Sequence, residues 1–374
     1  MSFSRRETRV FNSNRFKLGL FGLNCSGGIT LTHAPERWEP TWDNTVAAAQ
    51  LADEAGLEFL LPVARWLGHA GQTGPDGGAL ETLTWASGLL AATRDIVTFA
   101  TVHVPLVHPI FAARQAATAD LIGKGRFGLN VVSGWHTAEF DMFDVELRPH
   151  DERYAYTEEW LSIVRRIWSD PEPFEVRGRY FQLSGVAGYP KPHGGEQPLI
   201  MSAGSSDTGR AFAIREADCL LMVIVSFESL AKEIASLRSA TTRRIGVYAS
   251  GHVFCRPTEK ETEEYYHYIV HERGDWAAAD LMPQIRRPSE SIPADKLALM
   301  KERFVAGAGT FPVVGSPDQV AQEFQRLSQA GLDGMAIGLV NYVDDFPILR
   351  DEVLPRMERL GLRSPVSNES RPPA

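Results

Sequence analysis

Hydrophobic and polar positions alternate in two rhythms along this chain. From Phe16 onward, short runs of β-branched and aromatic residues are followed by longer segments in which apolar residues recur every three to four positions. The short runs predict strands at 16–20, 58–63, 96–102, 127–132, 199–201, 219–223, 245–253 and 334–337. The longer segments predict helices at 43–55, 81–93, 108–122, 151–168, 207–217, 227–239 and 316–330.

This alternation places the chain in the α/β class. About eight strand–helix pairs in one chain of this length favour a (β/α)8 TIM barrel. The alternative is a Rossmann-like pair of domains, although a doubly wound sheet usually has fewer strands per domain. We therefore predict a single barrel domain over residues 1–374, with its core at about 16–362.

Two stretches interrupt the rhythm and are predicted to be insertions in the barrel. Residues 171–198 combine an aromatic-rich hairpin pattern with a run of prolines and glycines. Residues 273–294 contain several prolines and show no clear periodicity, so we interpret them as a loop that could act as a lid. The first dozen residues and 364–374 are expected to be frayed tails.

Composition and charge exclude several classes of protein. The 374 residues are 44% hydrophobic and carry a formal net charge of −9, so no basic surface for nucleic acid is expected. The apolar runs are far shorter than the roughly 20 residues of a membrane helix, and the N-terminus lacks the apolar region of a signal peptide. The chain is therefore expected to be cytoplasmic. Its three cysteines, Cys25, Cys219 and Cys255, form no disulfide or zinc pattern, and we expect no metal.

Two glycine-rich segments differ in what they predict. Residues 123–128 fit the pattern G-x-G-x-x-G, but they end a helix and lead into a strand, which is the reverse of a dinucleotide-binding fingerprint. Residues 201–207 run from a strand through Gly204, Ser205 and Ser206 into a helix. Exposed N–H groups and hydroxyls at a helix N-terminus can bind a phosphate. An ordinary helix cap is the alternative.

Polar residues near strand ends are the other candidates for chemistry. Asn130 lies in an apolar strand and must find hydrogen-bond partners, either in the protein or in a ligand. His103 follows the third predicted strand, where a barrel enzyme presents residues to its substrate. We find no serine-hydrolase elbow and no pair of carboxylates at strand ends.

Five motifs in order resemble the bacterial-luciferase-like flavin monooxygenases. They are Asn-Cys-Ser-Gly-Gly at 24–28, Gly-Arg-Phe-Gly-Leu-Asn-Val-Val-Ser-Gly-Trp at 125–135, His-Asp-Glu-Arg-Tyr at 150–154, Ser-Ala-Gly-Ser-Ser at 202–206 and Gly-Leu-Asp-Gly at 331–334. The second motif looks most like the branch of dimethylsulfone, pyrimidine and alkanesulfonate monooxygenases. The resemblance covers about residues 16–362 and implies a barrel with insertions.

The family resemblance also implies a reaction and its partners. Relatives bind FMN, as FMNH2 from a separate NAD(P)H-dependent flavin reductase, and use it with O2 to oxygenate a small organic substrate such as a sulfone, a sulfonate or a nitrogen- or halogen-substituted ring. A homodimer or homotetramer is expected. Two alternatives remain open: a deazaflavin-dependent hydride-transfer enzyme on the same barrel, and a flavin-binding protein without activity.

Site residues follow from the positions that match the family motifs. Thr101 and Asn130 match the catalytic pair that faces flavin N5 and O2. The remaining positions that match cofactor-binding residues are Ala64, Arg65, Glu139, Arg153, Tyr154, Ser205 and Ser206. Residues expected in the substrate pocket are Asn24, Trp38, Trp66, His103, Trp135 and Trp276. Pro62 departs from the family pattern, so the substrate of any one relative should not be transferred.

Overall fold

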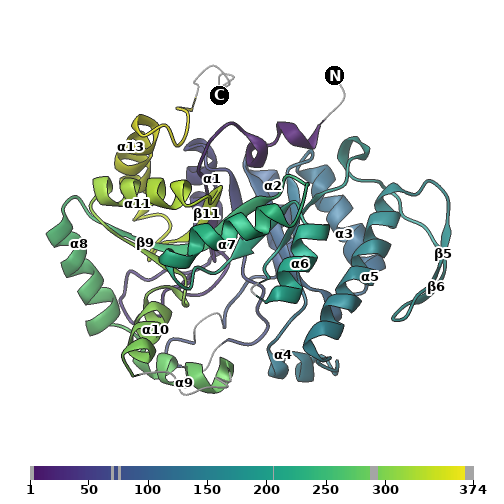
Figure 1. Ribbon diagram of the computed structural model, residues 1–374, viewed down its shortest axis with the longest axis horizontal. Helices are drawn as coiled ribbons and strands as arrows, with labels where there is room; N and C mark the ends of the chain where they lie inside the picture. The colour runs from purple at the N-terminus through teal and green to yellow at the C-terminus, as the bar shows by residue number, and fades with distance from the viewer. Residues whose placement is uncertain (1–3, 69–70, 75–76, 205, 287–293, 367–374) are drawn as a thin grey trace.

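Eight parallel strands close into a barrel within the part of the chain that the computed structural model describes, residues 4–68, 71–74, 77–204, 206–286 and 294–366 (Figure 1). The barrel strands are β1 (Lys17–Phe21), β2 (Phe59–Leu61), β3 (Val97–His103), β4 (Phe127–Val132), β7 (Leu199–Ser202), β8 (Cys219–Met222), β9 (Gly246–Cys255) and β11 (Gly334–Gly338). β11 pairs with β1 and so closes the ring. The predicted TIM barrel is confirmed, and the two-domain alternative is wrong.

A further strand, β10 (Phe311–Gly315), was not predicted from the sequence. It pairs in parallel with the second half of β9, whereas β8 pairs with the first half. Along one edge, the long strand β9 therefore pairs first with β8 and then with β10. The short run at 311–315 contains a proline and has a glycine at or near each end. Both residue types are uncommon within strands, so the hydrophobic pattern did not predict a strand here.

Helices surround the barrel, and most of those predicted are present (Figure 1). Those that follow barrel strands are α1 (Trp42–Glu54), α2 (Thr82–Ala92), α3 (Pro109–Ile122), α4 (Thr137–Met142), α5 (His150–Ser169), α6 (Asp207–Glu216), α7 (Phe227–Ser239) and α8 (Glu259–Tyr266). The later ones are α9 (Trp276–Arg286), α10 (Ala294–Gly307), α11 (Pro317–Gln329), α12 (Phe346–Ile348) and α13 (Leu354–Arg359). Side-chain caps fix their starts, as at Thr41 before α1 and Ser226 before α7.

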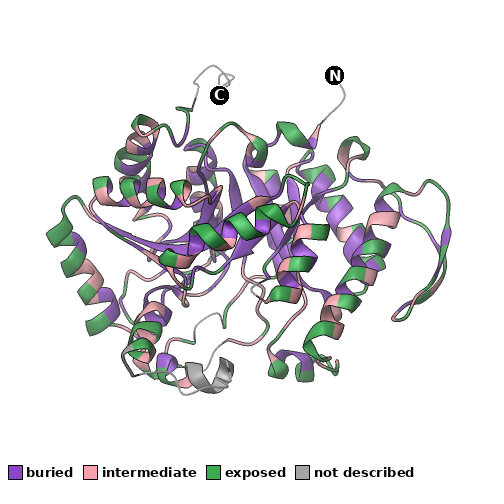
Figure 2. Ribbon diagram, in the orientation of Figure 1, coloured by how far each residue is buried: buried purple, intermediate pink, exposed green. Residues whose placement is uncertain are grey.

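The core has two layers, one inside the barrel and one between the strands and the helices (Figure 2). Inside, the rings of Phe59 and Phe99 meet edge to face, as do those of Phe59 and Tyr248. Gly19 and Gly128 face these rings, and a Cβ on either glycine would lie about 2.3 Å from a ring carbon. These glycines therefore give large aromatic residues the room to fill the barrel.

The N-terminal segment is ordered from residue 4, so the predicted fraying is wrong for this part. Arg5 is buried, and its guanidinium contacts Asp120 Oδ1 at 2.6 Å and Gly125 O at 2.5 Å. Val10 packs with the residues that fill the barrel interior. A buried ion pair between distant residues leaves no periodic signal in the sequence, which explains the error.

The two predicted insertions turn out differently. Residues 171–198 contain an antiparallel hairpin of β5 (Phe174–Arg177) and β6 (Gln182–Val186), as the sequence predicted. Within 273–294, however, α9 occupies half of the segment expected to be an irregular lid, and residues 287–293 lie outside the described residues. Asp275 begins α9 by accepting the Ala278 N–H through Oδ1 at 3.0 Å. The sequence analysis missed this cap and the helix-forming alanines behind it.

His252 on β9 gives the fold a dependence on pH. Burial, and secondarily the charge of Arg303, lowers its pKa to about 3, and Nδ1 lies 2.9 Å from Thr310 Oγ1. An unfolded histidine titrates near 6.5, so between about pH 6.5 and 3 the unfolded chain binds a proton that the folded chain does not. The free energy of unfolding should therefore fall on acidification by up to about 1.4 kcal/mol per pH unit.

Urea unfolding measured from pH 7 to pH 4 tests this expectation. His252→Asn should flatten the pH dependence, whereas His267→Asn, on an exposed side chain, should leave the slope as it is. An unchanged slope in His252→Asn would contradict the assignment.

Candidate active site

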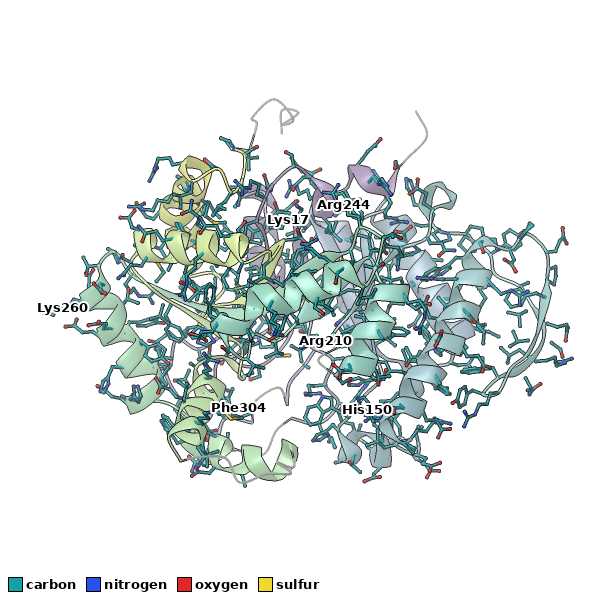
Figure 3. The ribbon with its side chains drawn as sticks, in the orientation of Figure 1. Lys17, His150, Arg210, Arg244, Lys260 and Phe304 are labelled. Carbon is teal, nitrogen blue, oxygen red and sulfur yellow. The ribbon has the colours of Figure 1, made fainter. Side chains whose placement is uncertain are left out.

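A large cavity of about 470 Å³ opens at the carboxyl ends of the barrel strands. In Figure 3, His150 at this cavity lies near the lower end of the barrel, whereas Lys17 at the start of β1 lies near the upper end. The cavity brings together these predicted residues: Ala64, Arg65, Thr101, His103, Asn130, Trp135, Arg153, Tyr154 and Ser206. Ser205 lies outside the described residues.

Thr101 and Asn130 form a hydrogen-bonded pair at the base of the large cavity. They are direct partners in the register of β3 and β4, and both are buried. Thr101 Oγ1 donates to Pro62 O at 2.7 Å and accepts from Asn130 Nδ2 at 3.1 Å. Asn130 Oδ1 is buried and has no hydrogen-bond partner among the residues that the structure describes. Thr101 therefore holds the amide in place, and the amide keeps one acceptor for a ligand.

The N-terminus of α6 forms another part of the cavity wall. Ser206 caps this helix by accepting the Gly209 N–H at 3.1 Å. Gly204 and Gly209 approach so closely that a Cβ on Gly204 would lie 2.6 Å from the Gly209 backbone. This close turn leaves N–H groups of the first helical turn beside the cavity, where the helix dipole favours an anion.

Arg153 and Tyr154 on α5 stand beside the start of α6. The Arg153 guanidinium donates to Gly134 O, and burial lowers the pKa of this arginine. The ring of Tyr154 packs on that of Phe212, with centroids 5.9 Å apart. The cavity wall therefore has a cation and an anion-binding helix terminus close together, which suits a phosphate group.

Glu139 connects two loops at the rim of the large cavity. Its side chain is fully buried, and Oε1 accepts the N–H groups of Trp66 and Leu67 at 2.8 and 3.2 Å. Its Oε2 lies 4.0 Å from Arg65 Nη1 and 3.7 Å from His103 Nδ1. Glu139 does not line the cavity itself. Its hydrogen bonds therefore hold the loop after β2.

Four of the residues expected in the substrate pocket do not line the large cavity. Asn24 uses its amide to join two loops, donating to Val63 O and Leu80 O at 2.8 and 3.1 Å. Trp38 is buried in the core, and Trp276 packs beside α10; neither lines the large cavity. Trp66 lines a separate, smaller chamber described below.

The cavity also contains residues that the sequence analysis did not select. They are Phe21, Pro62, Val63, Val132, Ser133, Gly134, His150, Ala203 and Leu221. Phe21 ends β1 and Leu221 lies in β8, so both occupy strand positions that the predicted barrel could have assigned to its interior. Their apolar side chains gave no chemical signal in the sequence.

A second cavity, of about 430 Å³, lies at the opposite end of the barrel, lined by Arg9, Arg126 and Arg363 among others. Arg126 donates to the carbonyls of Leu90, Thr93 and Ile96, and Arg9 is paired with Asp53. These cations stabilise the protein itself. We therefore assign the chemistry to the cavity at the carboxyl ends of the strands.

The described residues bear on metal and membrane binding too. Among them, no group of three or more His, Cys, Asp or Glu side chains is placed to hold a metal ion. No helix in the same part of the chain has the length and apolar character needed to cross a membrane.

Comparisons with known proteins agree with this fold. Residues 16–334 match the family of luciferase-like monooxygenases. An FMNH2-dependent dimethylsulfone monooxygenase of Pseudomonas fluorescens (strain Pf0-1) is 28% identical over 345 residues, which cover 90% of this chain and 93% of that protein. The pyrimidine monooxygenase RutA of Klebsiella variicola (strain At-22) is 27% identical over 369 residues, covering 94% and 99%.

A solved structure shows the same fold. The crystal structure of DmoA from Hyphomicrobium sulfonivorans has a TM-score of 0.82 at 18% identity, covering 96% of this chain and 90% of that one. The family match spans most of the chain, in agreement with the resemblance found in the five motifs. The chain therefore belongs to the luciferase-like monooxygenase family.

Proposed function

We propose that this chain is the oxygenating component of a two-component monooxygenase, which binds FMNH2 from a separate NAD(P)H-dependent flavin reductase and oxygenates a small organic substrate with O2. The observation that carries the proposal is that one cavity includes both the Thr101–Asn130 pair and the N-terminus of α6. When bound, reduced FMN supplies the electrons that activate O2. The similar proteins named above for dimethylsulfone and pyrimidine support the same reaction class.

The donors and acceptors of the large cavity fit a reduced flavin. The unpartnered Oδ1 of Asn130 can accept from a ring N–H, which reduced flavin offers and oxidised flavin lacks at N5. Ser206, Arg153 and the first N–H groups of α6 would hold the phosphate. Ala64 and Trp135 would line the rest of the flavin site.

Apart from binding the flavin, the protein mainly has to exclude water and orient the substrate. Phe21, Val132 and Leu221 give the cavity an apolar wall. The Arg65 guanidinium lies over the Trp135 ring, 4.9 Å from its centroid, and Glu139 fixes the loop that carries Arg65. These contacts give the entrance a defined shape before any ligand binds.

The deazaflavin alternative is less well supported by the charges near α6. A deazaflavin carries a longer acidic tail, which would need additional cations near Ser206. Arg210 is the nearby candidate, and its Nη2 is paired with Glu233 Oε2 at 3.2 Å (Figure 3). A flavin-binding protein without activity would not need the ordered Thr101–Asn130 pair.

Anaerobic titration followed by admission of O2 tests the proposed function. The protein should bind FMNH2 and, with ¹⁸O2, convert one of a panel of sulfones, sulfonates and nitrogen or chlorinated aromatics into a product that contains one labelled oxygen. Pure protein with FMN should not oxidise NADH until a reductase is added. Stoichiometric NADH oxidation without a reductase, or the absence of FMNH2 binding, would contradict the proposal.

Ser206→Ala tests the phosphate end of the site. Removing the hydroxyl should weaken FMNH2 binding about tenfold, since a hydrogen bond to a charged group is worth about 1.5 kcal/mol or more. Ser206→Thr should keep most of the affinity. Ser226→Ala is the matched control, because Ser226 caps α7 in the same way but does not line the large cavity. Equal dissociation constants for Ser206→Ala and Ser226→Ala, measured anaerobically, would exclude the role.

A further inference from the structure

A side chamber of about 60 Å³ adjoins the large cavity. The two spaces share four lining residues, Ala64, Arg65, Thr101 and His103, which form the doorway between them. A single water needs only about 10–15 Å³, so the side chamber has room for a short chain of heavy atoms.

The wall of the side chamber is largely apolar. It is built from the segment before α2, the start of that helix and the turn after β3, and its apolar members are Trp66, Ala79, Leu80, Leu83, Val102, Leu106 and Val107. An aliphatic group that enters from the large cavity would therefore be removed from water, at a gain of about 0.8 kcal/mol per methylene. A polar head would stay at the doorway.

At the doorway, the positive charge of Arg65 is already balanced by a carboxylate and is not available to an anionic substrate. The Arg65 guanidinium faces the buried carboxylate of Glu139, 4.0 Å away. Burial lowers the pKa of His103, although Glu139 raises it, and the charges of Arg65 and His136 lower it further. The imidazole is therefore neutral at neutral pH, and the group formed by Arg65, Glu139 and His103 has no net charge.

A second carboxylate lies at the wall of the side chamber itself. Glu81 caps α2 by accepting the N–H groups of Leu83 and Thr84 at 3.0 and 2.8 Å, and it also lines the side chamber. The remaining cation of the large cavity, Arg153, stands at the end assigned to the phosphate. An anion placed at the doorway would therefore lose its hydration beside a carboxylate and gain no unpaired cation.

We propose that the side chamber is the substrate's apolar subsite and that Glu139 and Glu81 make it selective for uncharged molecules, so that neutral compounds with a short alkyl group are oxygenated in preference to anions of the same size. This inference rests on the proposed function. According to this inference, two carboxylates that do not line the flavin end of the large cavity determine whether neutral or anionic substrates are preferred.

Matched pairs of substrates test the charge selectivity. Methyl alkyl sulfones, from dimethyl to butyl methyl, should be oxygenated with kcat/KM at least tenfold above that of the alkanesulfonates of equal chain length. Glu81→Gln should lower the ratio of kcat/KM for sulfones to kcat/KM for sulfonates severalfold while keeping the cap of α2. Glu139→Gln should lower this ratio further. Asp43→Asn, in the first turn of α1, is the control and should leave the ratio unchanged.

Filling the side chamber tests the size of the subsite. Ala79→Leu should lower kcat/KM for butyl methyl sulfone at least tenfold, change that for dimethyl sulfone by less than threefold, and leave FMNH2 affinity unaltered because Ala79 does not line the large cavity. The control Ala91→Leu adds the same side chain at an exposed position of α2.

The outcomes separate this inference from the proposed function. Loss of FMNH2 binding, or no oxygenation of any compound in the panel, would refute the proposed function and the inference with it. If only the nitrogen or chlorinated aromatics are oxygenated, the proposed function stands and the subsite is refuted. If the enzyme binds FMNH2 and oxygenates sulfonates as well as sulfones, or if Ala79→Leu keeps the chain-length profile of the wild type, the proposed function stands and the subsite is refuted. Because Glu81 is exposed, its effect on the ratio should also weaken with added salt.

Discussion

Replacing Thr101 with valine is expected to lower the rate of oxygenation by about 10²–10³-fold while leaving the affinity for FMNH2 within about threefold of the wild type. The hydroxyl accepts from Asn130 Nδ2 and donates to Pro62 O, so valine removes both bonds in one step. The Asn130 amide would then lose the contact that holds its Oδ1 in place to accept from a flavin N–H. Preorganised polar groups in a dry site contribute most when their orientation is fixed.

Thr101→Ser is the matched control for this prediction. Serine keeps the hydroxyl and should retain at least a third of the wild-type rate in single-turnover experiments with preloaded FMNH2. Asn130→Leu should cost about as much as Thr101→Val, and the double variant little more, because the two side chains act as one unit. Additive losses, or a wild-type rate in Thr101→Val, would show that Thr101 only fills the barrel.

Replacing Glu139 with leucine is expected to destabilise the protein by about 3–5 kcal/mol, the usual effect of removing one partner of a buried ion pair. The carboxylate is fully buried, accepts the N–H groups of Trp66 and Leu67, and faces Arg65. Leucine would leave two backbone donors without an acceptor, in addition to the lost charge. The loop after β2 should loosen, and the KM for substrate should rise along with the loss of stability.

Chemical denaturation and limited proteolysis measure the effect of this change. Glu139→Leu should shift the unfolding midpoint strongly and expose new cleavage sites near Trp66. Asp141→Asn alters an exposed acid on the same helix, α4, and should change the free energy of unfolding by less than about 0.5 kcal/mol. Equal stability of the two variants would mean that Glu139 has no positioning role.

The barrel could be predicted from the sequence because its strands and helices are each set by local pattern. Strands such as β3 are buried along their whole length, and helices such as α1 carry their own caps. The errors arose where distant residues decide the structure. Arg5 is ordered by Asp120, more than a hundred residues away, and α9 begins at Asp275, which also holds Thr73 from another loop.

The candidate site was predictable in its polar part and not in its apolar part. Asn130 could be found as a polar residue in an apolar strand, and Thr101 through the resemblance to the family. Tryptophans carry no such signal: Trp38 packs in the core and Trp135 lines the cavity, although both follow a barrel strand. Of the two carboxylates near the side chamber, Glu139 was selected through the family resemblance, whereas Glu81 was not, because a helix-capping glutamate gives no sign in the sequence that it also lines a cavity.

The pairing of β1 with β11 has a consequence for how the chain is made in the cell. Lys17 pairs with Gly334, so the first strand waits for a partner that is synthesised more than 300 residues later. At ribosomal rates of about 5–20 residues per second, that interval lasts roughly 15–60 s. Throughout it, one edge of β1 offers unpaired backbone groups to other nascent chains. Slowing translation should therefore increase aggregation of this protein, and chaperones that cover strand edges should matter most before β11, which precedes about the last tenth of the chain, has emerged.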